Sequence, residues 1–316
     1  MIDVERLKAR REVVFHGSCP DGTSSALVCQ AALMRLGVEA EYRSVQYGTD
    51  AFEKMEPAPG QLFVDITPPR ARWEEWAGTD VVVLDHHESA KHIVEGLGGV
   101  FGLNETHSGA RLAFEHVFSP VGGVSARECA EWDRFTHLSM VRDTWKSKSP
   151  DWEEACHQAY GLTVFGASVC LEMQKAGRFD PALVMRLGKK AFGRATLLAG
   201  SAFRRPFWCD PIGRDLVVGV INCTEARLVS DACHVLLDSG VDVAVSYFLM
   251  FQDEVDVMQV SLRTREPWAR KIAEANGGGG HDQAAGFRIR GAASVSVDAL
   301  MTLIIRSLHK VVSGQV

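Results

Sequence analysis

Three apolar segments in the first third of the chain each end directly in residues that can bind a metal ion. The segment EVVF runs into His16, QLFV runs into Asp65, and VVVL runs into Asp85, His86 and His87. Short runs of this kind, separated by helical stretches, are typical of a parallel sheet covered by helices. Because ligands gather at the carboxyl ends of such strands, these side chains predict one functional site at that edge.

A parallel sheet also accounts for the residues between these segments. EAEYRSVQY fits a further strand, and SSALVCQAALMRLG has the apolar spacing and the terminal glycine of a helix. RARWEEWAG is a shorter candidate helix. A chain of 316 residues exceeds the size at which one core normally keeps growing. We therefore predict an α/β protein in which residues 1–200 form a parallel-sheet domain ending in a linker helix. Residues 201–316 would form a smaller α/β domain, with the active site in the interdomain cleft.

The charge and composition of the chain exclude several classes of function. A net charge of −6 argues against coating long duplex nucleic acid, which needs many Lys and Arg contacts to phosphate, whereas a short anionic substrate needs few. The charged start, the short apolar runs and eight cysteines without a C-x-x-C pair favour a cytoplasmic protein with free thiols and no membrane partner. The sequence also lacks the motifs of P-loop triphosphatases, dinucleotide oxidoreductases and serine hydrolases.

Carboxylates and imidazoles gathered at one sheet edge predict a metal site. Asp21 follows the first strand and joins His16, Asp65 and His86 there. This mixture of ligands suits Mn²⁺ or a similar ion, in one or two copies, with Mg²⁺ or Co²⁺ as alternatives. One carboxylate can bridge two ions that lower the pKa of a shared water and bind both oxygens of a phosphoryl displacement. The pattern therefore predicts a hydrolase.

The second domain carries a different signal, a run of glycines between a helix and a strand. Four successive glycines allow backbone N–H groups to converge on an anion, which predicts a phosphate-binding nest. The nearby SLRTR segment supplies arginines, whose planar fork suits phosphate oxygens. The residues expected to contact the substrate are Arg263, Gly278, Gly279, Gly280 and His281, with Arg265 and Arg288 as rim charges.

These motifs resemble those of a known family. VVVLDHH is similar to the signature of the DHH phosphoesterases, FVDITPP to their second motif, and GGGGHDQAAGF to the glycine-rich motif of the associated DHHA1 domain. FHGSCPDGTSSA matches the HG-x-C-x-DG form of the first motif, which is found in a subgroup related to oligoribonucleases. NETHSGARLAFEHVF and VRDTW also fit that subgroup. The resemblance spans most of the chain.

The resemblance implies a role for each residue of the site in the first domain. Asp65 would bridge two metal ions and His86 would be a ligand. Asp143 of VRDTW would complete the shell of the second ion. Asp85 would orient its neighbours, and His87 would contact the scissile phosphate rather than the metal.

Two of the implied assignments have alternatives. Asp133 is the rival of Asp143 as the last ligand. His107 and Ser108 would lie beside the substrate by the resemblance, but the same residues also suit a loop that caps the helix starting at Gly109.

Cys19 departs from the family pattern. Many relatives carry a second Asp at this place, two residues before the Asp at Asp21. Cys19 is then a thiolate ligand, or the first ion is held more weakly by His16 and Asp65, or that ion is absent. The number of metal ions stays open.

The sequence as a whole predicts a Mn²⁺-dependent, exonuclease-like phosphodiesterase. The resemblance to the family implies short oligonucleotides or linear dinucleotides as substrates, which the chain would hydrolyse to nucleoside monophosphates. A cyclic-dinucleotide phosphodiesterase is the near alternative, and GGGGHDQAAGF argues against inorganic pyrophosphate. A nucleotide-binding module with weakened turnover is the rival from another class, supported by Cys19. The oligomeric state stays open, and a homodimer is one candidate.

Overall fold

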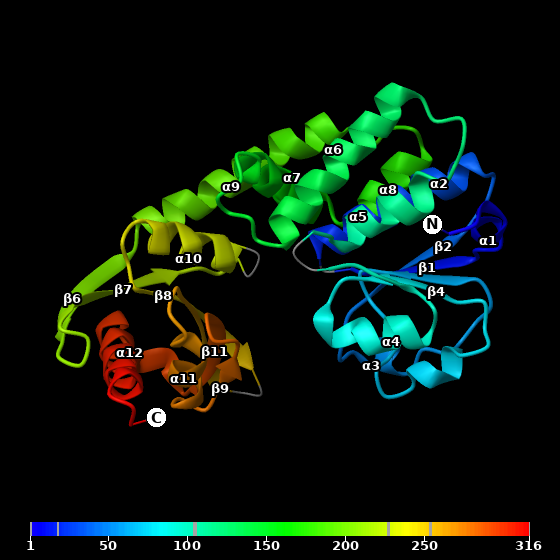
Figure 1. Cartoon of the computed structure of the whole chain (residues 1–316). Coiled ribbons are helices and arrows are strands. Elements are labelled where there is room, and N and C mark those ends of the chain that lie inside the picture. The colour runs from blue at the N-terminus through cyan, green and yellow to red at the C-terminus, as the bar shows by residue number, and fades with distance from the viewer. Residues whose placement is uncertain (1, 18, 104–105, 226–227, 253–254, 316) are drawn as a thin grey trace. The chain divides into compact units, whose positions relative to one another are not determined.

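The computed structural model of the chain describes residues 2–17, 19–103, 106–225, 228–252 and 255–315 (Figure 1). Ser18 of the first motif and Asn104 and Glu105 of a later motif lie outside the described residues. The chain divides into two compact units, Met1–Ala191 and Phe192–Val316, and the division falls within helix α9, Pro181–Gly200. No helix among the described residues is long and apolar enough to cross a membrane.

In the first unit, strands alternate with helices and are followed by a helical segment. In chain order its elements are α1 (Val4–Lys8), β1 (Glu12–His16), α2 (Pro20–Arg35), β2 (Glu41–Val45), α3 (Asp50–Glu53), β3 (Gln61–Val64), η1 (Trp73–Trp76), β4 (Val82–Asp85), η2 (Glu88–Ala90), α4 (Lys91–Gly96), β5 (Val100–Phe101), α5 (Gly109–Ala113), η3 (Phe114–Phe118), α6 (Ala126–Asp143), α7 (Trp152–Phe165), α8 (Ala167–Lys175) and the start of α9.

The first unit is built on a five-stranded parallel sheet with the strand order β2-β1-β3-β4-β5. This confirms the predicted parallel α/β fold. The strand order reverses at β1. After β1 the chain adds β2 on one side of this strand and then β3 on the other side. Ligands of open parallel sheets bind at such a switch point, outside the carboxyl ends of the strands.

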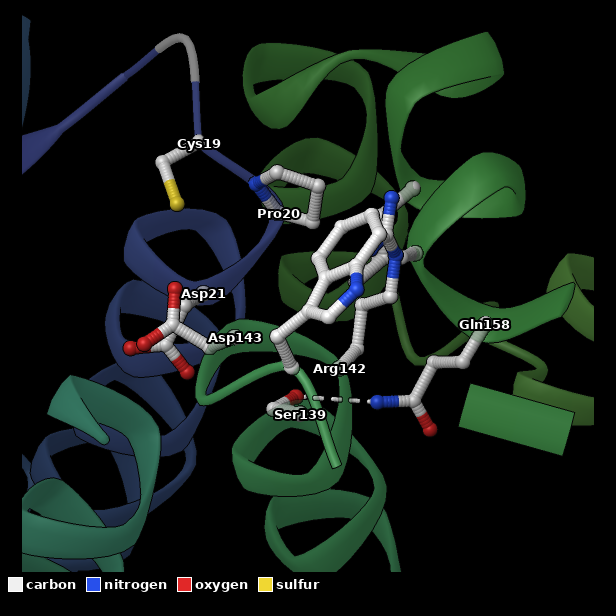
Figure 2. Close-up of a pocket in the computed structure, with 10 residues that line it drawn as sticks. Cys19, Pro20, Asp21, Ser139, Arg142, Asp143 and Gln158 are labelled. Carbon is white, nitrogen blue, oxygen red and sulfur yellow. Dashed lines mark hydrogen bonds between the residues drawn. The ribbon is translucent and has the colours of Figure 1, made fainter. Parts of the chain in front are cut away.

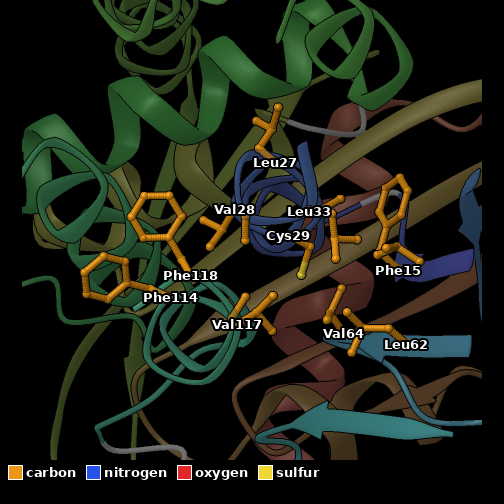
Figure 3. Packing of buried hydrophobic residues seen from close by; sticks show 14 of the residues in the cluster. Phe15, Leu27, Val28, Cys29, Leu33, Leu62, Val64, Phe114, Val117 and Phe118 are labelled. Atoms are coloured by element: carbon orange, nitrogen blue, oxygen red, sulfur yellow. The ribbon is translucent and has the colours of Figure 1, made fainter. Parts of the chain in front are cut away.

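Both faces of the central strands β1, β3 and β4 are buried, because their side chains alternate between two apolar clusters. Phe15 of β1 packs with Leu62 and Val64 of β3 in the cluster that also contains side chains of α2 (Figure 3). Val14 of β1 and Phe63 of β3 belong to the cluster on the other face. The strand ends that carry the polar residues are therefore held from both sides.

Two helical segments differ from the sequence prediction. RARWEEWAG, expected as a short helix, forms only the 3₁₀ turn η1. The 18-residue helix α6 was not predicted, and its last residue is Asp143. Its apolar positions are separated by many charged residues, which weakens the helical pattern in the sequence.

The second unit contains a six-stranded mixed sheet in the order β10-β11-β9-β8-β7-β6. Strands β7 and β8 pair in parallel and the other neighbours are antiparallel. Side chains of α11 and α12 share one apolar core with the sheet. The predicted smaller α/β domain is confirmed. Its elements are β6 (Phe203–Cys209), β7 (Arg214–Asn222), α10 (Val229–Asp238), β8 (Val243–Gln252), β9 (Val255–Thr264), α11 (Ala269–Glu274), β10 (Gly279–Gly280), β11 (Ala284–Arg290), η5 (Ala292–Ser294) and α12 (Val297–Val312).

Candidate metal centre and substrate site

Three strands of the parallel sheet bring histidine and aspartate side chains together at one edge. His16 ends β1, Asp65 follows β3, and His86 follows β4. Nε2 of His86 lies 3.3 Å from Oδ1 of Asp65, and Nδ1 of His16 lies 3.8 Å from Oδ2 of the same carboxylate. Asp65 is therefore shared by the two histidines.

Helix α6 adds a further carboxylate to this edge. Oδ2 of Asp143, the last residue of the helix, lies 3.3 Å from Nε2 of His86. The side chain of Asp133 is 53% exposed, and its Oδ1 pairs instead with Nη1 of Arg111 at 2.6 Å. Of the two aspartates that the sequence left as rivals, the structure brings Asp143 to the cluster.

Asp21 reaches the cluster from the first turn of α2. Its Oδ1 accepts a hydrogen bond of 2.7 Å from the hydroxyl of Ser108, and its Oδ2 lies 3.3 Å from the backbone nitrogen of Ala110. Asp21 and Asp143 lie close together (Figure 2), and each offers an oxygen within 4.8 Å of a ring nitrogen of His86. The start of α5 thus fixes the carboxylate that α2 supplies.

Two glycines allow these elements to approach so closely. A Cβ atom at position 22 would lie 2.1 Å from the carbonyl oxygen of His16, and one at Gly109 would lie 2.5 Å from Cβ of Asp65. Real Cβ atoms do not make contacts that short, so Gly22 and Gly109 are required by the packing at the site. Sequence reasoning did not single out either glycine, although both stand inside the quoted motifs.

The carboxylate of Asp65 is buried without adequate compensation from the chain. The residue is fully buried, and neither of its side-chain oxygens has a hydrogen-bond donor in good geometry among the described residues. Burial, together with the nearby charge of Asp21, raises the pKa of Asp65 well above its ordinary range. An uncompensated buried carboxylate is costly, and a bound divalent cation would offset that cost.

The pKa values of the neighbouring groups also reflect an excess of acids. Burial and the charge of Asp21 raise the pKa of Asp143 to about 6. Burial lowers the pKa of His86, but the Asp65 carboxylate at 3.3 Å and the charges of Asp143 and Asp21 outweigh this effect and raise that pKa to about 10. Both shifts indicate a pocket that attracts positive charge.

The side chains form overlapping groups that fit one or two metal ions. In each group, ligand atoms lie within 4.8 Å of one another. Asp65 and His86 each belong to two of the groups, and their oxygen and nitrogen donors suit a borderline divalent ion such as Mn²⁺. The groups are Asp65 with Asp85, His86 and His87; His16 with Cys19 and Asp65; and Asp21 with His86 and Asp143.

Cys19 belongs to the group that contains His16 and Asp65, at the residue before helix α2. Burial and the charges of Asp65 and Asp143 raise the pKa of the Cys19 thiol well above its ordinary value. A bound cation has the opposite effect, because a coordinating thiol is deprotonated outright. Cys19 thus lies where its sulfur could be a ligand, the first of the three sequence alternatives, and coordination through sulfur stays a prediction.

Substituting Co²⁺ tests the role of Cys19. We expect Co²⁺ to give a sulfur-to-metal charge-transfer band in the near ultraviolet with the unaltered chain, and Cys19→Ser to remove it. Cys29→Ser is the matched control, because Cys29 is buried and belongs to none of the ligand groups among the described residues. An unchanged band in Cys19→Ser would contradict sulfur coordination.

The side chain of Asp85 accepts hydrogen bonds from the two residues that follow it. Its Oδ1 accepts hydrogen bonds from the backbone N–H groups of His86 and His87 at 2.7 and 3.1 Å. Nδ1 of His87 lies 2.6 Å from the same oxygen. The hydrogen bond to Asp85 raises the pKa of His87. Because an ionised carboxylate only accepts, Nδ1 carries a proton, and the ring of His87 is oriented by Asp85.

His107 and Ser108 lie in different surroundings. The Ser108 hydroxyl is fully buried, donates to Asp21 and accepts from the N–H of Arg111, so it caps helix α5. This is the capping alternative from the sequence, and a buried hydroxyl of this kind is not accessible to a substrate. Nε2 of His107, a half-buried residue, lies 3.4 Å from Oε2 of Glu115.

The glycine run of the second unit does not fold as the predicted nest. The N–H groups of Gly277 and Gly278 donate to carbonyls at the end of helix α11, at 3.1 and 2.8 Å. Gly277 has a φ of 76°, which is common for the glycine that ends a helix. The run therefore begins as a helix C-cap, and these two N–H groups are already used within the unit.

The remainder of the run forms the first strand of a hairpin. Gly279 and Gly280 are strand β10 and pair antiparallel with β11. The N–H of His281 donates to the carbonyl of Ala284 at 2.8 Å, while the residue itself is exposed. The expectation that the backbone of the run converges on an anion is thus corrected, because the N–H groups of Gly277, Gly278 and His281 are engaged within the unit. The imidazole of His281 stays exposed to solvent.

The arginines expected around this motif differ in their contacts. Arg263 is half-buried on β9, with Nη2 donating to Oγ of Ser230 at 2.8 Å. Arg265 is exposed and pairs with Asp238. Nε of Arg288, also exposed, donates to Oε1 of Gln259 at 2.9 Å.

Several residues near the metal centre were missed by the sequence reasoning. Gln46 follows β2, and its Oε1 lies 3.0 Å from Nε2 of His16. The same rule that located His16 and Asp65, a polar residue directly after a strand, would have found it. Arg142 and Trp145 line a cavity beside Asp143. Both belong to the VRDTW motif, so the motif could have indicated them.

Comparisons with known proteins complete the description of the fold. A comparison with protein-family models finds no match, and neither does a comparison with curated proteins. Among solved structures, the chain is similar to the pGpG-specific phosphodiesterase PggH from Vibrio cholerae, with 16% identity, coverage of 94% of this chain and 99% of that chain, and a TM-score of 0.56.

Two further solved structures are similar to the chain in fold. Exonuclease RecJ bound to manganese is 15% identical, with 96% of this chain and 90% of that chain covered and a TM-score of 0.58. The solved DHH domain of a member of a ribosomal-protein family is 12% identical, with 96% of this chain and 88% of that chain covered and a TM-score of 0.54. The chain thus has the two-domain fold of the DHH proteins, and the resemblance drawn from its motifs is confirmed at the level of the fold.

Proposed function

We propose that this chain is a metal-dependent phosphodiesterase that hydrolyses short oligonucleotides or linear dinucleotides to nucleoside monophosphates. The observation that carries the proposal is the sharing of Asp65 and His86 between groups of ligating atoms that lie within 4.8 Å of one another. The fold shared with a phosphodiesterase and an exonuclease supports the same reaction class.

The ligand residues are proposed to be His16, Asp21, Asp65, His86 and Asp143, with Cys19 as a further donor. Bound divalent ions would supply Lewis-acid polarisation of the phosphoryl oxygens and a nucleophile at neutral pH. The chain's own contribution is to hold these donors rigidly, because the strand ends are packed from both sides.

His87 is proposed to donate a hydrogen bond to the scissile phosphate. Its Nδ1 is occupied by Asp85, so Nε2 is the atom that can face a substrate. The raised pKa of His87 favours the imidazolium, in which Nε2 also carries a proton. A donor held in this way stabilises the charge that develops on a phosphoryl oxygen.

The second unit is proposed to bind the substrate through side chains. Arg263 and His281 are the proposed contacts, since the N–H groups of Gly277 and Gly278 are engaged within the unit. An arginine fork suits a terminal phosphate, and it needs no base to be recognised. Such contacts would favour short chains over long nucleic acid.

A substrate panel tests the proposed function. We expect the purified chain to release nucleoside monophosphates from 5′-phosphorylated RNA dinucleotides and pentanucleotides when Mn²⁺ is present, and not when it is removed by EDTA. Mg²⁺, Co²⁺ and cyclic dinucleotides complete the panel, and faster cleavage of a cyclic dinucleotide would reassign the substrate. Nucleotide binding without metal-dependent cleavage of any diester would contradict the proposal and favour a binding module.

A further inference from the structure

A cavity of about 200 Å³ lies beside the metal-binding side chains of the first unit (Figure 2). Its wall on one side includes Cys19, Asp21 and Asp143, which belong to the ligand groups. The rest of its wall comes from the end of α6, the segment after it and helix α7. The residues that matter there are Arg142, Trp145 and Gln158.

Trp145 is held in a fixed orientation at this cavity. The guanidinium carbon of Arg142 lies 4.2 Å from the centroid of the indole ring, a close cation–π contact. The ring of Trp152 lies 5.0 Å away at an interplanar angle of 65°. The same arginine also lies 5.1 Å from the centroid of Trp152. An aromatic ring packed in this way is a preorganised surface and loses little freedom when a ligand stacks on it.

The backbone at Trp145 is strained. Its φ is 53°, and the other non-glycine residue with a positive φ among the described residues is Asp65, at 59°. Bulky residues avoid the left-handed region, and such outliers concentrate at functional sites, where the surrounding structure imposes them. Both outliers of the described chain thus belong to the metal centre or to the cavity beside it.

The polar groups of the cavity are also fixed. Nε2 of Gln158 donates to Oγ of Ser139 and to the carbonyl of Phe135, both at 2.9 Å. Both amide protons are therefore used, and Oε1 of Gln158 is the atom left to accept a hydrogen bond. An aromatic wall matches a flat ring that can stack on it.

We propose that this cavity binds one nucleobase of the substrate, stacked on Trp145, while the phosphodiester lies at the metal-binding side chains. The inference rests on the proposed function and deepens it by assigning a specificity-determining residue. A cavity of about 200 Å³ has room for a single ring system. Stacking on an aromatic surface tolerates any base, so Trp145 would favour nucleotides over other phosphodiesters.

Abasic substrates separate this role from a general loss of activity. The comparison uses an RNA dinucleotide and two analogues in which hydrogen replaces either the 5′ or the 3′ base. We expect the unaltered chain to show a KM about 10-fold lower for the dinucleotide than for one of the analogues, because base stacking contributes that much. Trp145→Ala should bring the two KM values together, and Trp145→Phe should keep most of the difference.

The ratio of KM values is measured on one preparation, so partial unfolding of a variant does not affect it. Trp73→Ala is the control, since Trp73 packs against Gly96 and His92 and does not line the cavity. Equal KM values for all three substrates with the unaltered chain would overturn the inference, as would an unchanged ratio in Trp145→Ala. Failure of the proposed function would look different, because none of the three diesters would be cleaved.

Discussion

Replacing Asp65 with Asn is expected to reduce Mn²⁺-dependent diester hydrolysis by about 1000-fold or more, because the variant loses the carboxylate shared by two ligand groups. The amide keeps the size of the side chain but removes its charge. Steady-state hydrolysis of an RNA dinucleotide at saturating Mn²⁺ measures the loss. Retained turnover would contradict the assignment of the metal centre.

The same substitution should have the opposite effect on stability when metal is absent. Because the pKa of Asp65 is raised in the folded chain, stability falls as the pH rises above the ordinary carboxyl pKa, and the loss grows until the pH reaches the raised value. A neutral amide removes this cost. We expect metal-free Asp65→Asn to be more stable than the unaltered chain by about 1 kcal/mol or more. Thermal unfolding with and without Mn²⁺ should then show stabilisation by the ion in the unaltered chain and little in the variant.

Asp143→Asn and Asp133→Asn form a matched pair with unequal expected effects. Asp143 lies 3.3 Å from His86, whereas Asp133 is exposed and pairs with Arg111. We expect Asp143→Asn to lower kcat/KM by about 100-fold and to raise the Mn²⁺ concentration needed for activity. The kcat/KM of Asp133→Asn should stay within about twofold of that of the unaltered chain, since exposed ion pairs contribute little.

A titration of activity against Mn²⁺ checks both variants. A large loss of kcat/KM in Asp133→Asn combined with a small loss in Asp143→Asn would make Asp133 the ligand instead of Asp143. Equal losses would mean that neither carboxylate is a specific ligand, because the two differ in burial and in distance from His86.

The place where the candidate ligand side chains gather could be predicted because it follows from strand geometry. His16, Asp65 and His86 each stand at the end of an apolar segment, and parallel strands bring their carboxyl ends to one edge. The same argument does not reach Asp143. That residue ends a helix whose charged residues hide its apolar face, so its assignment depended on the resemblance to a family.

The contacts of the second unit could not be predicted because hydrogen bonds depend on tertiary partners. A glycine run is compatible with a nest, a flexible loop or a helix cap, and the sequence does not choose among them. Here the end of α11 and the pairing with β11 decide the outcome. Ser108 shows the same limit, since its burial against Asp21 depends on how α5 meets α2.

The close approach at Gly109 has a consequence for how the metal centre could change in evolution. Helix α5 touches the backbone end of β3 only because this residue has no side chain, and a single methyl group would overlap Cβ of Asp65. Moving the helix outward to make room would also withdraw the Ser108 hydroxyl from Asp21. The geometry of two carboxylates thus depends on the absence of a side chain at Gly109.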